Sequence, residues 1–147
     1  MKSFMNRKAS HNYYFIEDFE AGIVLKGTEI KSLRAGKLSF KDSYAVIKKG
    51  EVWLLNLHIS PYDKEAHFNH EPERERKLLL NKREIKKLTR KAEEQGMTIV
   101  PKSVYINAKG LAKVKISLAK GKHNYDKREV LMKKDQQRDL ERRMKYN

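Results

Sequence analysis

The segment that decides the fold is MTIVPKSVYINAKGLAKVKISLA, residues 97–119, in which two β-rich runs are joined by the turn residues NAKG. The second run alternates, with Ala112, Val114, Ile116 and Leu118 facing inward and Lys113, Lys115 and Ser117 facing outward. Successive side chains of a strand point to opposite faces, so this pattern predicts a strand with one buried side. Pro101 cannot donate a ladder hydrogen bond, which predicts a sheet edge or a β-bulge at its position.

Further strands are expected upstream of this segment. YYFIEDFEAGIVL, residues 13–25, predicts two short strands broken around Ala21-Gly22, because glycine permits a sharp bend or bulge. SYAVIKKGEVWLLNLHI, residues 43–59, predicts a hairpin that turns at Lys49-Gly50. Its faces are expected to hold Trp53, Leu55, Leu57 and Ile59 on one side and Val52 and Leu54 on the other. Residues 1–10 are polar and basic without periodicity and predict an exposed arm.

Two helices are expected between these strands. The first, residues 27–36, has Thr28 as a candidate N-cap and Gly36 to end it in a left-handed conformation. The second, residues 81–96, begins with the capping pair Asn81 and Glu84 and stops at Gly96. Its apolar stripe is Ile85, Leu88 and Ala92, and its basic face is Lys82, Arg83, Lys86, Lys87, Arg90 and Lys91. The polar residues 60–76 are expected to form a long loop.

This order of elements predicts a mainly β fold: a small closed antiparallel barrel of six or seven strands with an OB-like core and two or three accessory helices. A chain of 147 residues fits one domain. We expect a basic N-terminal arm at 1–10, the barrel at 11–120 and a basic tail at 121–147. The apolar residues of the tail form no continuous stripe, so the tail is predicted to be disordered in the free protein.

The charge of the chain favours a polyanionic partner. Thirty-four Lys and Arg against nineteen Asp and Glu give a formal net charge of +15, which favours nucleic acid over a membrane. No run approaches the ~18 apolar residues that a membrane span needs, and the first ten residues lack the apolar core of a secretory signal. The absence of cysteine fits a reducing interior. We therefore expect a cytoplasmic protein.

Catalytic chemistry has little support in the sequence. RAGKLS, residues 34–39, lacks the upstream glycine of a phosphate-binding P-loop. His67 and His70 with Glu65 or Glu71 match metal-ligand types, but the favoured interpretation is a solvated loop. Acidic pairs show no sign of the apolar pocket that raises the pKa of a general acid. We expect no catalytic site, no cofactor and no metal.

Basic and aromatic residues are the candidates for RNA contact. In RERKLLLN, residues 74–81, Arg74, Arg76 and Lys77 can donate to phosphate oxygens beside an apolar anchor, Leu78 to Leu80. Alternatively, the leucines belong to the core and the cations only flank it. The aromatic run at 13–15 can stack on bases, although aromatic residues in strands more often pack in a core. The basic face of the second helix either contacts RNA or is simply solvated.

Several longer motifs resemble one known family. They are NRKASH at 6–11, FEAGIVLKGTEIKSLRAGK at 19–37, DSYAVI at 42–47, NHEPERERKLLLNKREI at 69–85 and KGKHNYDKRE at 120–129. In this order and spacing they resemble small protein B, the SsrA-binding proteins that partner tmRNA in bacterial trans-translation. The similarity extends from about Asn6 to Glu129, and motifs of this length are highly specific.

The resemblance implies a protein that binds the tRNA-like domain of tmRNA. It implies delivery of that RNA, charged with alanine and escorted by elongation factor Tu, to the decoding site of a stalled ribosome, where the nascent chain is tagged and the ribosome is released. A monomer with no membrane partner is expected. The implied RNA-binding residues are Asn6, Glu20 and Leu79, beside the basic Arg7, Lys8, Arg74, Arg76, Lys77 and Lys122. The implied ribosome-binding tail residues are Asp126, Lys127, Arg128, Lys133 and Lys134.

Some features of the family pattern leave alternatives open. HNYYFIED, residues 11–18, is shifted by one residue relative to the usual family run, which leaves the register of the first strand open. Glu20 either orients a neighbouring cation or accepts a hydrogen bond from a base or a 2′-hydroxyl, because a carboxylate does not bind phosphate.

The resemblance also implies a role for the tail. The tail is expected to enter the vacant mRNA path of the ribosome and become helical there.

Three other classes share part of this description. A ribosomal protein or general RNA chaperone has the same charge and barrel but binds many RNAs. An RNA-processing enzyme needs a cluster of acid, base or metal ligands, which the sequence does not contain. A membrane-surface protein needs a broader apolar helix face than residues 85–92 provide.

Overall fold

The computed structural model of the chain describes residues 2–64 and 69–122. The helices are α1 (Arg7–Asn12), α2 (Gly27–Arg34) and α3 (Lys82–Gln95). The strands are β1 (Lys2–Met5), β2 (Tyr13–Ile23), β3 (Leu38–Ser39), β4 (Tyr44–Lys48), β5 (Glu51–Leu55), β6 (His58–Ile59), β7 (Arg76–Leu79), β8 (Thr98–Ile106) and β9 (Ala112–Gly121). The predictions for the tail residues Asp126, Lys127, Arg128, Lys133 and Lys134, and for His67, lie outside the described residues.

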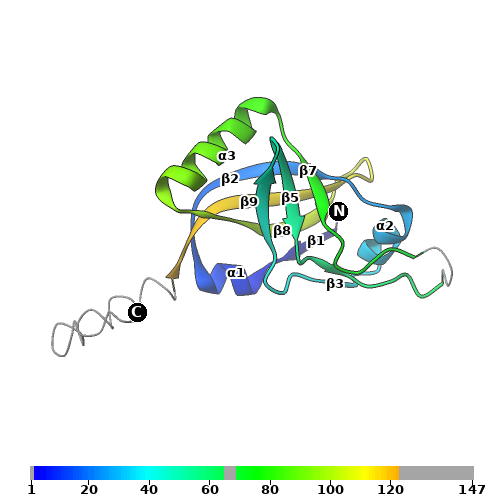
Figure 1. The fold of residues 1–147 in the computed structure, drawn as a ribbon. Coiled ribbons are helices and arrows are strands. Elements are labelled where there is room, and N and C mark those ends of the chain that lie inside the picture. Colours follow the sequence, from blue (N-terminus) through cyan, green and yellow to red (C-terminus); the bar gives the residue numbers. More distant parts are fainter. Residues whose placement is uncertain (1, 65–68, 123–147) are drawn as a thin grey trace.

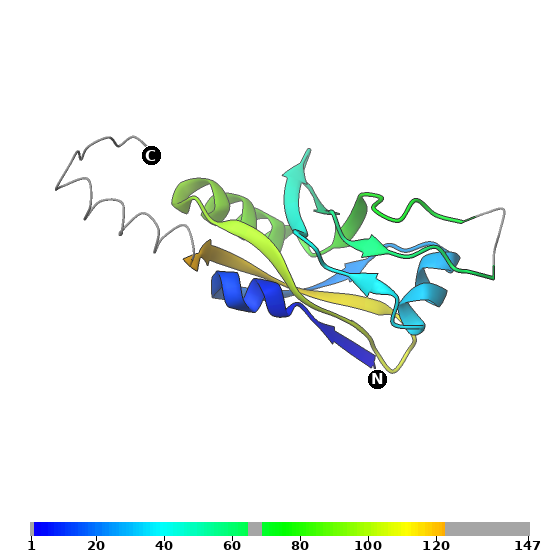
Figure 2. The ribbon, with the colours of Figure 1, turned by 90° about the horizontal axis from the view of Figure 1, so that it is seen from below.

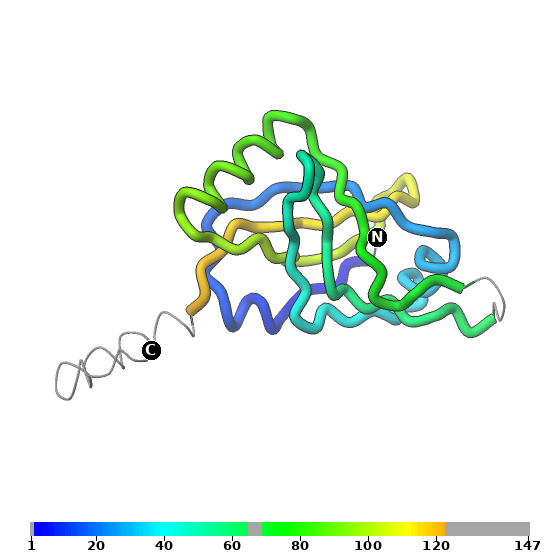
Figure 3. The backbone as a smooth tube through the Cα atoms, in the orientation of Figure 1, coloured from blue at the N-terminus to red at the C-terminus, as the bar shows by residue number. Residues whose placement is uncertain are grey.

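The main sheet closes on itself. Its strand order is β1-β8-β4-β5-β7-β2-β9, and β9 pairs back to β8, so six strands form a ring of antiparallel neighbours with β1 added beside β8 (Figures 1 and 3). Strand pairing is longest between β2 and β9 and between β9 and β8. It is shortest between β4 and β8, where only Ala45 and Ile99 are paired. Strands β3 and β6 form a separate two-stranded sheet. The predicted mainly β fold with a closed antiparallel sheet is confirmed.

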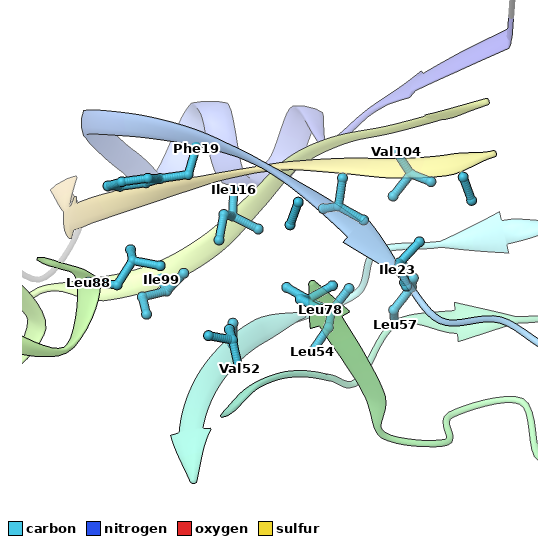
Figure 4. Packing of buried hydrophobic residues seen from close by; sticks show 14 of the residues in the cluster. Phe19, Ile23, Val52, Leu54, Leu57, Leu78, Leu88, Ile99, Val104 and Ile116 are labelled. Atoms are coloured by element: carbon cyan, nitrogen blue, oxygen red, sulfur yellow. The ribbon is translucent and has the colours of Figure 1, made fainter. Parts of the chain in front are cut away.

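Apolar side chains from all sides of the ring form one core. Figure 4 shows Leu88 of α3 beside Ile99 and Ile116, and Leu54, Leu57 and Leu78 gathered across from them. Leu33 of α2 is also fully buried in this cluster. Helices α2 and α3 thus each contribute one fully buried leucine, and Ile30 of α2 and Ile85 and Ala92 of α3 pack beside it, as apolar stripes of this kind predict.

Turns and caps follow the local signals of the sequence. Lys49 and Gly50 have φ of 52° and 76°, the conformation of a tight hairpin turn between β4 and β5. Gly36 and Gly96 have φ of 75° and 63°, so both predicted helix ends are confirmed. The register of β8 against β9 shifts between Pro101 and Ser103, which confirms the predicted bulge. The capping pair of α3 is present, with the Asn81 side chain accepting from the Glu84 N–H at 2.8 Å.

The predicted break in the first strand is wrong. Strand β2 continues through Ala21 and Gly22. Gly22 pairs with Lys113 of β9 on one side and with Leu79 of β7 on the other, so β2 joins these two strands at this residue. A Cβ atom at Gly22 would lie 3.4 Å from the Leu79 Cβ, so the glycine permits close strand approach rather than a bend. The irregularity falls instead between Phe15 and Glu17, which fixes the register that the sequence left open.

The expected face of residues 53–59 is also wrong. Asn56 has φ of 65°, which ends β5 and reverses the side taken by the residues that follow. Leu57 and Ile59 are therefore fully buried together with Val52 and Leu54, whereas Trp53 lies on the outer side. Ser117, expected to face outward, is buried, and its hydroxyl lies within hydrogen-bond distance of two acceptors, the Glu17 and Leu118 carbonyl oxygens at 3.0 and 3.1 Å.

The N-terminal residues form structure rather than an exposed arm. Residues 2–5 extend the sheet as β1 by pairing with β8, and residues 7–12 form α1. Val100 and Ala119 pack with Ala9 of α1 in a small second apolar cluster.

The predicted Thr28 cap of α2 is also wrong. Lys26 is the N-cap of α2, and the Thr28 hydroxyl lies 2.8 Å from His70 Nδ1.

Candidate nucleic-acid interface

A row of side chains crosses the outer face of the sheet. Paired residues of an antiparallel sheet point to the same side. The register therefore aligns one row across β7, β2, β9, β8 and β1, made of Leu79, Gly22, Lys113, Tyr105 and Ser3. Their inward neighbours Ala21, Val114 and Val104 are buried, which assigns this row to the outside.

A second row lies beside the first. It consists of Glu20, Lys115, Ser103 and Met5, which are paired in turn across β2, β9, β8 and β1. Leu79 and Met5 are 52% and 62% exposed, unusual for large apolar side chains, and Glu20 and Lys115 are exposed. We call Glu20, Leu79, Tyr105, Lys113 and Lys115 the outer-face patch. It combines cations, an aromatic ring and apolar surface, the mixture that a nucleic acid backbone and its bases require.

Asn6 follows directly after this second row but uses its side chain inside the protein. Its Oδ1 accepts from the Ala9 N–H at 3.1 Å and so caps α1, and its Nδ2 donates to the Pro101 carbonyl oxygen at 2.8 Å. The side chain is 5% exposed. Asn6 therefore fixes α1 against the bulge of β8, and the exposed Arg7 and Lys8 that follow it are held in place by this anchor.

Cations and polar groups surround the start of α1 and the end of β9. Lys8 pairs with Asp42 at 2.7 Å, and both residues line a cavity of about 390 Å³ together with Asn6, Tyr13, Lys41 and Gly121. Lys122 lies 5.1 Å from the Tyr14 ring centroid, so this cation faces an exposed aromatic ring. Figure 2 shows α1 and the end of β9 side by side at one end of the molecule.

Two arginines predicted to contact phosphate lie at the opposite end, beside α2. Arg76 is fully buried: its guanidinium donates to Glu29 at 2.7 Å, to the Leu57 carbonyl oxygen at 2.5 Å and to the Pro72 carbonyl oxygen at 3.0 Å. The Arg76 donors that these three bonds use are thus occupied within the fold, so the predicted phosphate contact of Arg76 has no support from the structure and stays a prediction. Arg74 also donates to Glu29, at 2.6 and 3.2 Å, but remains partly exposed.

Glu29 is the centre of this cluster. Burial alone would raise the pKa of its carboxyl group, but hydrogen bonds from Arg74, from the Lys26 backbone and from Arg76 hold that pKa below its ordinary value. Burial lowers the pKa of the Arg76 guanidinium, and the charge of Glu29 opposes that shift. The pair thus joins α2 to β7 as a buried ion pair and fixes the base of the loop between them.

The remaining candidates have mixed roles. Lys77 lies on the outer side of β7, where it pairs with Glu51 at 2.7 Å while its side chain keeps 38% exposure. Tyr13 and Phe15 pack against the cluster beneath α1, whereas Tyr14 is 48% exposed and its ring faces Lys122. His70 is buried, with Nε2 placed to donate to the Ile59 carbonyl oxygen at 2.8 Å, so both of its ring nitrogens serve the fold.

The structure brings Glu20 and Leu79 onto one outer face, and the backbone of Asn6 follows directly after it. Arg74 and Arg76 lie apart from this face, beside α2. The sequence pattern predicts Lys113 and Lys115 to face outward but does not mark them as site residues, and no local pattern marks Tyr105 or Glu29. The alternation of β9 is the signal that could have identified the two lysines. The positions of Tyr105 and Glu29 depend on contacts between distant segments, which no local pattern reveals. Of the alternatives for Glu20, the cross-strand position opposite Lys115 favours orientation of a cation.

Two further features bear on the class of protein. Among residues 2–64 and 69–122, no three His, Asp or Glu side chains gather in a possible metal site. No helix in the described part of the chain is long and apolar enough to span a bilayer. A closed antiparallel β ring with a basic, partly aromatic outer face defines the class as a small barrel protein suited to nucleic acid.

Comparison with known proteins identifies the family. The family model described as SmpB protein matches residues 3–146. An SsrA-binding protein of Ligilactobacillus salivarius is 55% identical over 140 residues, covering 95% of this chain and 90% of the relative. An SsrA-binding protein of Streptococcus agalactiae is 54% identical over 143 residues, covering 97% and 92%. The chain therefore belongs to the SmpB protein family, and the resemblance seen in its motifs is confirmed.

A solved structure shares the fold at similar identity. It is described as "tmRNA-SmpB: a journey to the center of the bacterial ribosome" and aligns with a TM-score of 0.71 at 51% identity, covering 82% of this chain and 84% of the solved chain. The agreement in fold and sequence extends over most of the described residues.

Proposed function

We propose that this chain binds the tRNA-like domain of tmRNA and acts with it on stalled ribosomes in trans-translation. Membership of the SmpB protein family, relatives known as SsrA-binding proteins and a similar solved chain associated with tmRNA and the bacterial ribosome support this function. It acts by binding rather than by catalysis, in the cytoplasm where ribosomes work. Elongation factor Tu is an indirect partner through the charged RNA.

The observation that carries the proposal is the composition of the outer-face patch. Glu20 and Leu79 come from distant parts of the sequence, yet they lie on neighbouring strands of one outer face, flanked by Lys113 and Lys115. In the proposed complex, the lysines contact phosphates, Leu79 and Tyr105 contact bases or sugars, and Glu20 orients Lys115. Asn6 acts through its anchor of α1, which positions Arg7 and Lys8.

The proposal divides the chain into two functional parts. The barrel recognises RNA, and the tail from residue 121 onward serves on the ribosome, through Asp126, Lys127, Arg128, Lys133 and Lys134. A chain truncated after Lys122 keeps the outer-face patch, so it should bind the tRNA-like domain but fail to support tagging. Loss of RNA binding on truncation would refute this division.

Recovery of RNA with the tagged chain from a bacterial lysate tests the function. We expect one tRNA-like RNA to dominate the recovered material. The double variant Lys113→Gln/Lys115→Gln should recover much less of it, whereas a control that removes the same charge from turns, Lys49→Gln/Lys109→Gln, should match the wild type. A mixture of many RNAs, equally reduced in both variants, would favour a general RNA chaperone.

A further inference from the structure

A third row of side chains lies between the outer-face patch and α1. Asp18 of β2 pairs in register with Ser117 of β9. Asp18 is two residues from Glu20, and Ser117 is two residues from Lys115, so both lie on the same outer side as the patch. Lys102 is the extra residue of the β8 bulge, and its side chain completes this row.

The Lys102 side chain crosses β9 on this outer side. Its Nζ lies 2.9 Å from Asp18 Oδ2 and 4.6 Å from the centroid of the Phe15 ring, and both partners belong to β2, on the far side of β9. Ser117 of β9 is fully buried although it lies on the outer side. The Lys102 and Asp18 side chains are 25% and 41% exposed, so Lys102 directs its charge to Asp18 more than to solvent.

The backbone of the same bulge supports α1. The Lys102 carbonyl oxygen accepts from the Asn6 N–H at 2.9 Å, and the Pro101 carbonyl oxygen accepts from Asn6 Nδ2 at 2.8 Å. Asn6 is the N-cap of α1, so the exposed Arg7 and Lys8 follow directly after these contacts. The cations of α1 are thus tied to the bulge whose extra side chain holds Asp18.

Asp18 is an anion placed between two groups of cations. The α1 cations lie on one side of it, and the lysines of the outer-face patch lie on the other. Burial would raise the pKa of the Asp18 carboxyl group, but the hydrogen bond and the charge of Lys102 hold that pKa below its ordinary value, so Asp18 is ionised at neutral pH. A carboxylate without a counter-charge here would repel a phosphate backbone that runs from one group of cations to the other.

We propose that Lys102 is a positioning residue of the RNA interface: it neutralises Asp18 and so joins the α1 cations and the outer-face patch into one track for the phosphate backbone of a single RNA. This inference deepens the proposed function and rests on it, because it takes the outer face as the RNA-binding surface. Lys102 acts through Asp18 and Asn6 and does not itself bind a phosphate.

The test measures how full-length variants bind the tRNA-like domain of tmRNA, and an RNA hairpin of unrelated sequence, as a function of salt. The variants are Lys102→Met, Lys102→Arg, Asp18→Asn and the double variant Asp18→Asn/Lys102→Met. The control is Lys48→Met. Lys48 also pairs with a carboxylate, that of Glu75 at 2.8 Å, and faces an aromatic ring, that of Trp53 at 5.6 Å, but it lies on β4, outside all three rows. Each variant is melted in parallel.

We expect Lys102→Met to weaken binding of the tRNA-like domain roughly three- to tenfold at 0.1 M salt, because Asp18 loses its counter-charge. Lys102→Arg keeps the charge and should bind within about twofold of the wild type. Asp18→Asn should bind as tightly as the wild type or more tightly. The double variant should return to within about twofold of the wild type, because the two effects are coupled. Lys48→Met should bind like the wild type.

Two results would overturn the proposal. A double variant as weak as Lys102→Met, with a salt slope lower by about one unit, would show that Lys102 itself binds a phosphate. Weaker binding by Asp18→Asn, together with a lower melting temperature, would assign the ion pair to the fold alone. A wild type that binds the hairpin as tightly as the tRNA-like domain would overturn the proposed function, while the order of the variants on the hairpin would still decide the role of Lys102. A wild type that binds neither RNA would overturn both.

Discussion

Replacing Glu29 by Gln should strongly destabilise the fold. The Glu29 carboxylate is fully buried and accepts hydrogen bonds from Lys26, Arg74 and Arg76, and Arg76 is fully buried as well. Glutamine keeps the shape but leaves the Arg76 charge without its partner. Breaking a buried ion pair from one side costs about 3–5 kcal/mol, a large part of the ~5–15 kcal/mol that stabilises a domain.

The assay is urea unfolding at pH 7, compared with Glu51→Gln as a matched control. Glu51 also pairs with a cation of β7, Lys77, but the two side chains are 44% and 38% exposed. A pair so exposed contributes about 0–1 kcal/mol, so the control should unfold near the wild-type midpoint. Equal effects of the two substitutions would refute the structural role assigned to the Glu29 and Arg76 pair.

The same pair sets a pH dependence with a defined sign. The pKa of Glu29 is lower in the folded protein than its ordinary value of 4.5, so the folded state favours the charged carboxylate. The contribution of Glu29 to stability is therefore present above pH 4.5 and is lost as the pH falls through the folded pKa. The difference in unfolding free energy between wild type and Glu29→Gln should shrink over that range; a difference that grows toward low pH would contradict the assignment.

Three further outcomes follow from the described contacts. Asn6→Ala removes the cap of α1 and the hydrogen bond that Asn6 Nδ2 donates to the Pro101 carbonyl oxygen, so we expect a loss of about 0.5–2 kcal/mol in urea unfolding, and an unchanged midpoint would contradict the capping role. Lys113→Gln and Lys115→Gln should each lower the salt slope of RNA binding by about one unit, while any folded Arg76 variant should keep the wild-type slope. Gly96→Ala places a side chain at φ of 63° and should lower stability by about 1 kcal/mol, measured by thermal melting, with Gly27→Ala in open space as a milder control.

Local signals in the sequence predicted much of the fold. The alternation of residues 112–118 correctly assigned the buried face of β9 except for Ser117, and positive-φ glycines marked the ends of α2 and α3. Such signals work because the conformational preference and the side-chain pattern belong to the same few residues. The closed sheet then followed from the number and order of the strands.

The features that the sequence did not predict depend on partners far along the chain. Residues 2–5 carry no strand pattern of their own and become β1 because β8 offers an edge. Asn56 reverses the faces of the following residues through a positive φ that few non-glycine residues adopt. Arg76 resembles a surface phosphate ligand in the sequence, but in the fold it is buried against Glu29 of α2, a partner 47 residues away along the chain. The outer-face patch is likewise assembled from four strands, β2, β7, β8 and β9.

Binding of the outer-face patch to the tRNA-like domain of tmRNA is tested most directly by titrating that RNA into isotope-labelled protein and following backbone amide chemical shifts. The proposed interface predicts that the largest shifts occur at Gly22, Leu79, Tyr105, Lys113 and Lys115, with smaller changes around Arg7 and Lys8. Amides near Arg76 and Glu29 should stay unchanged. Shifts confined to α2 and the loop before β7, with the outer-face patch unaffected, would contradict the proposed interface.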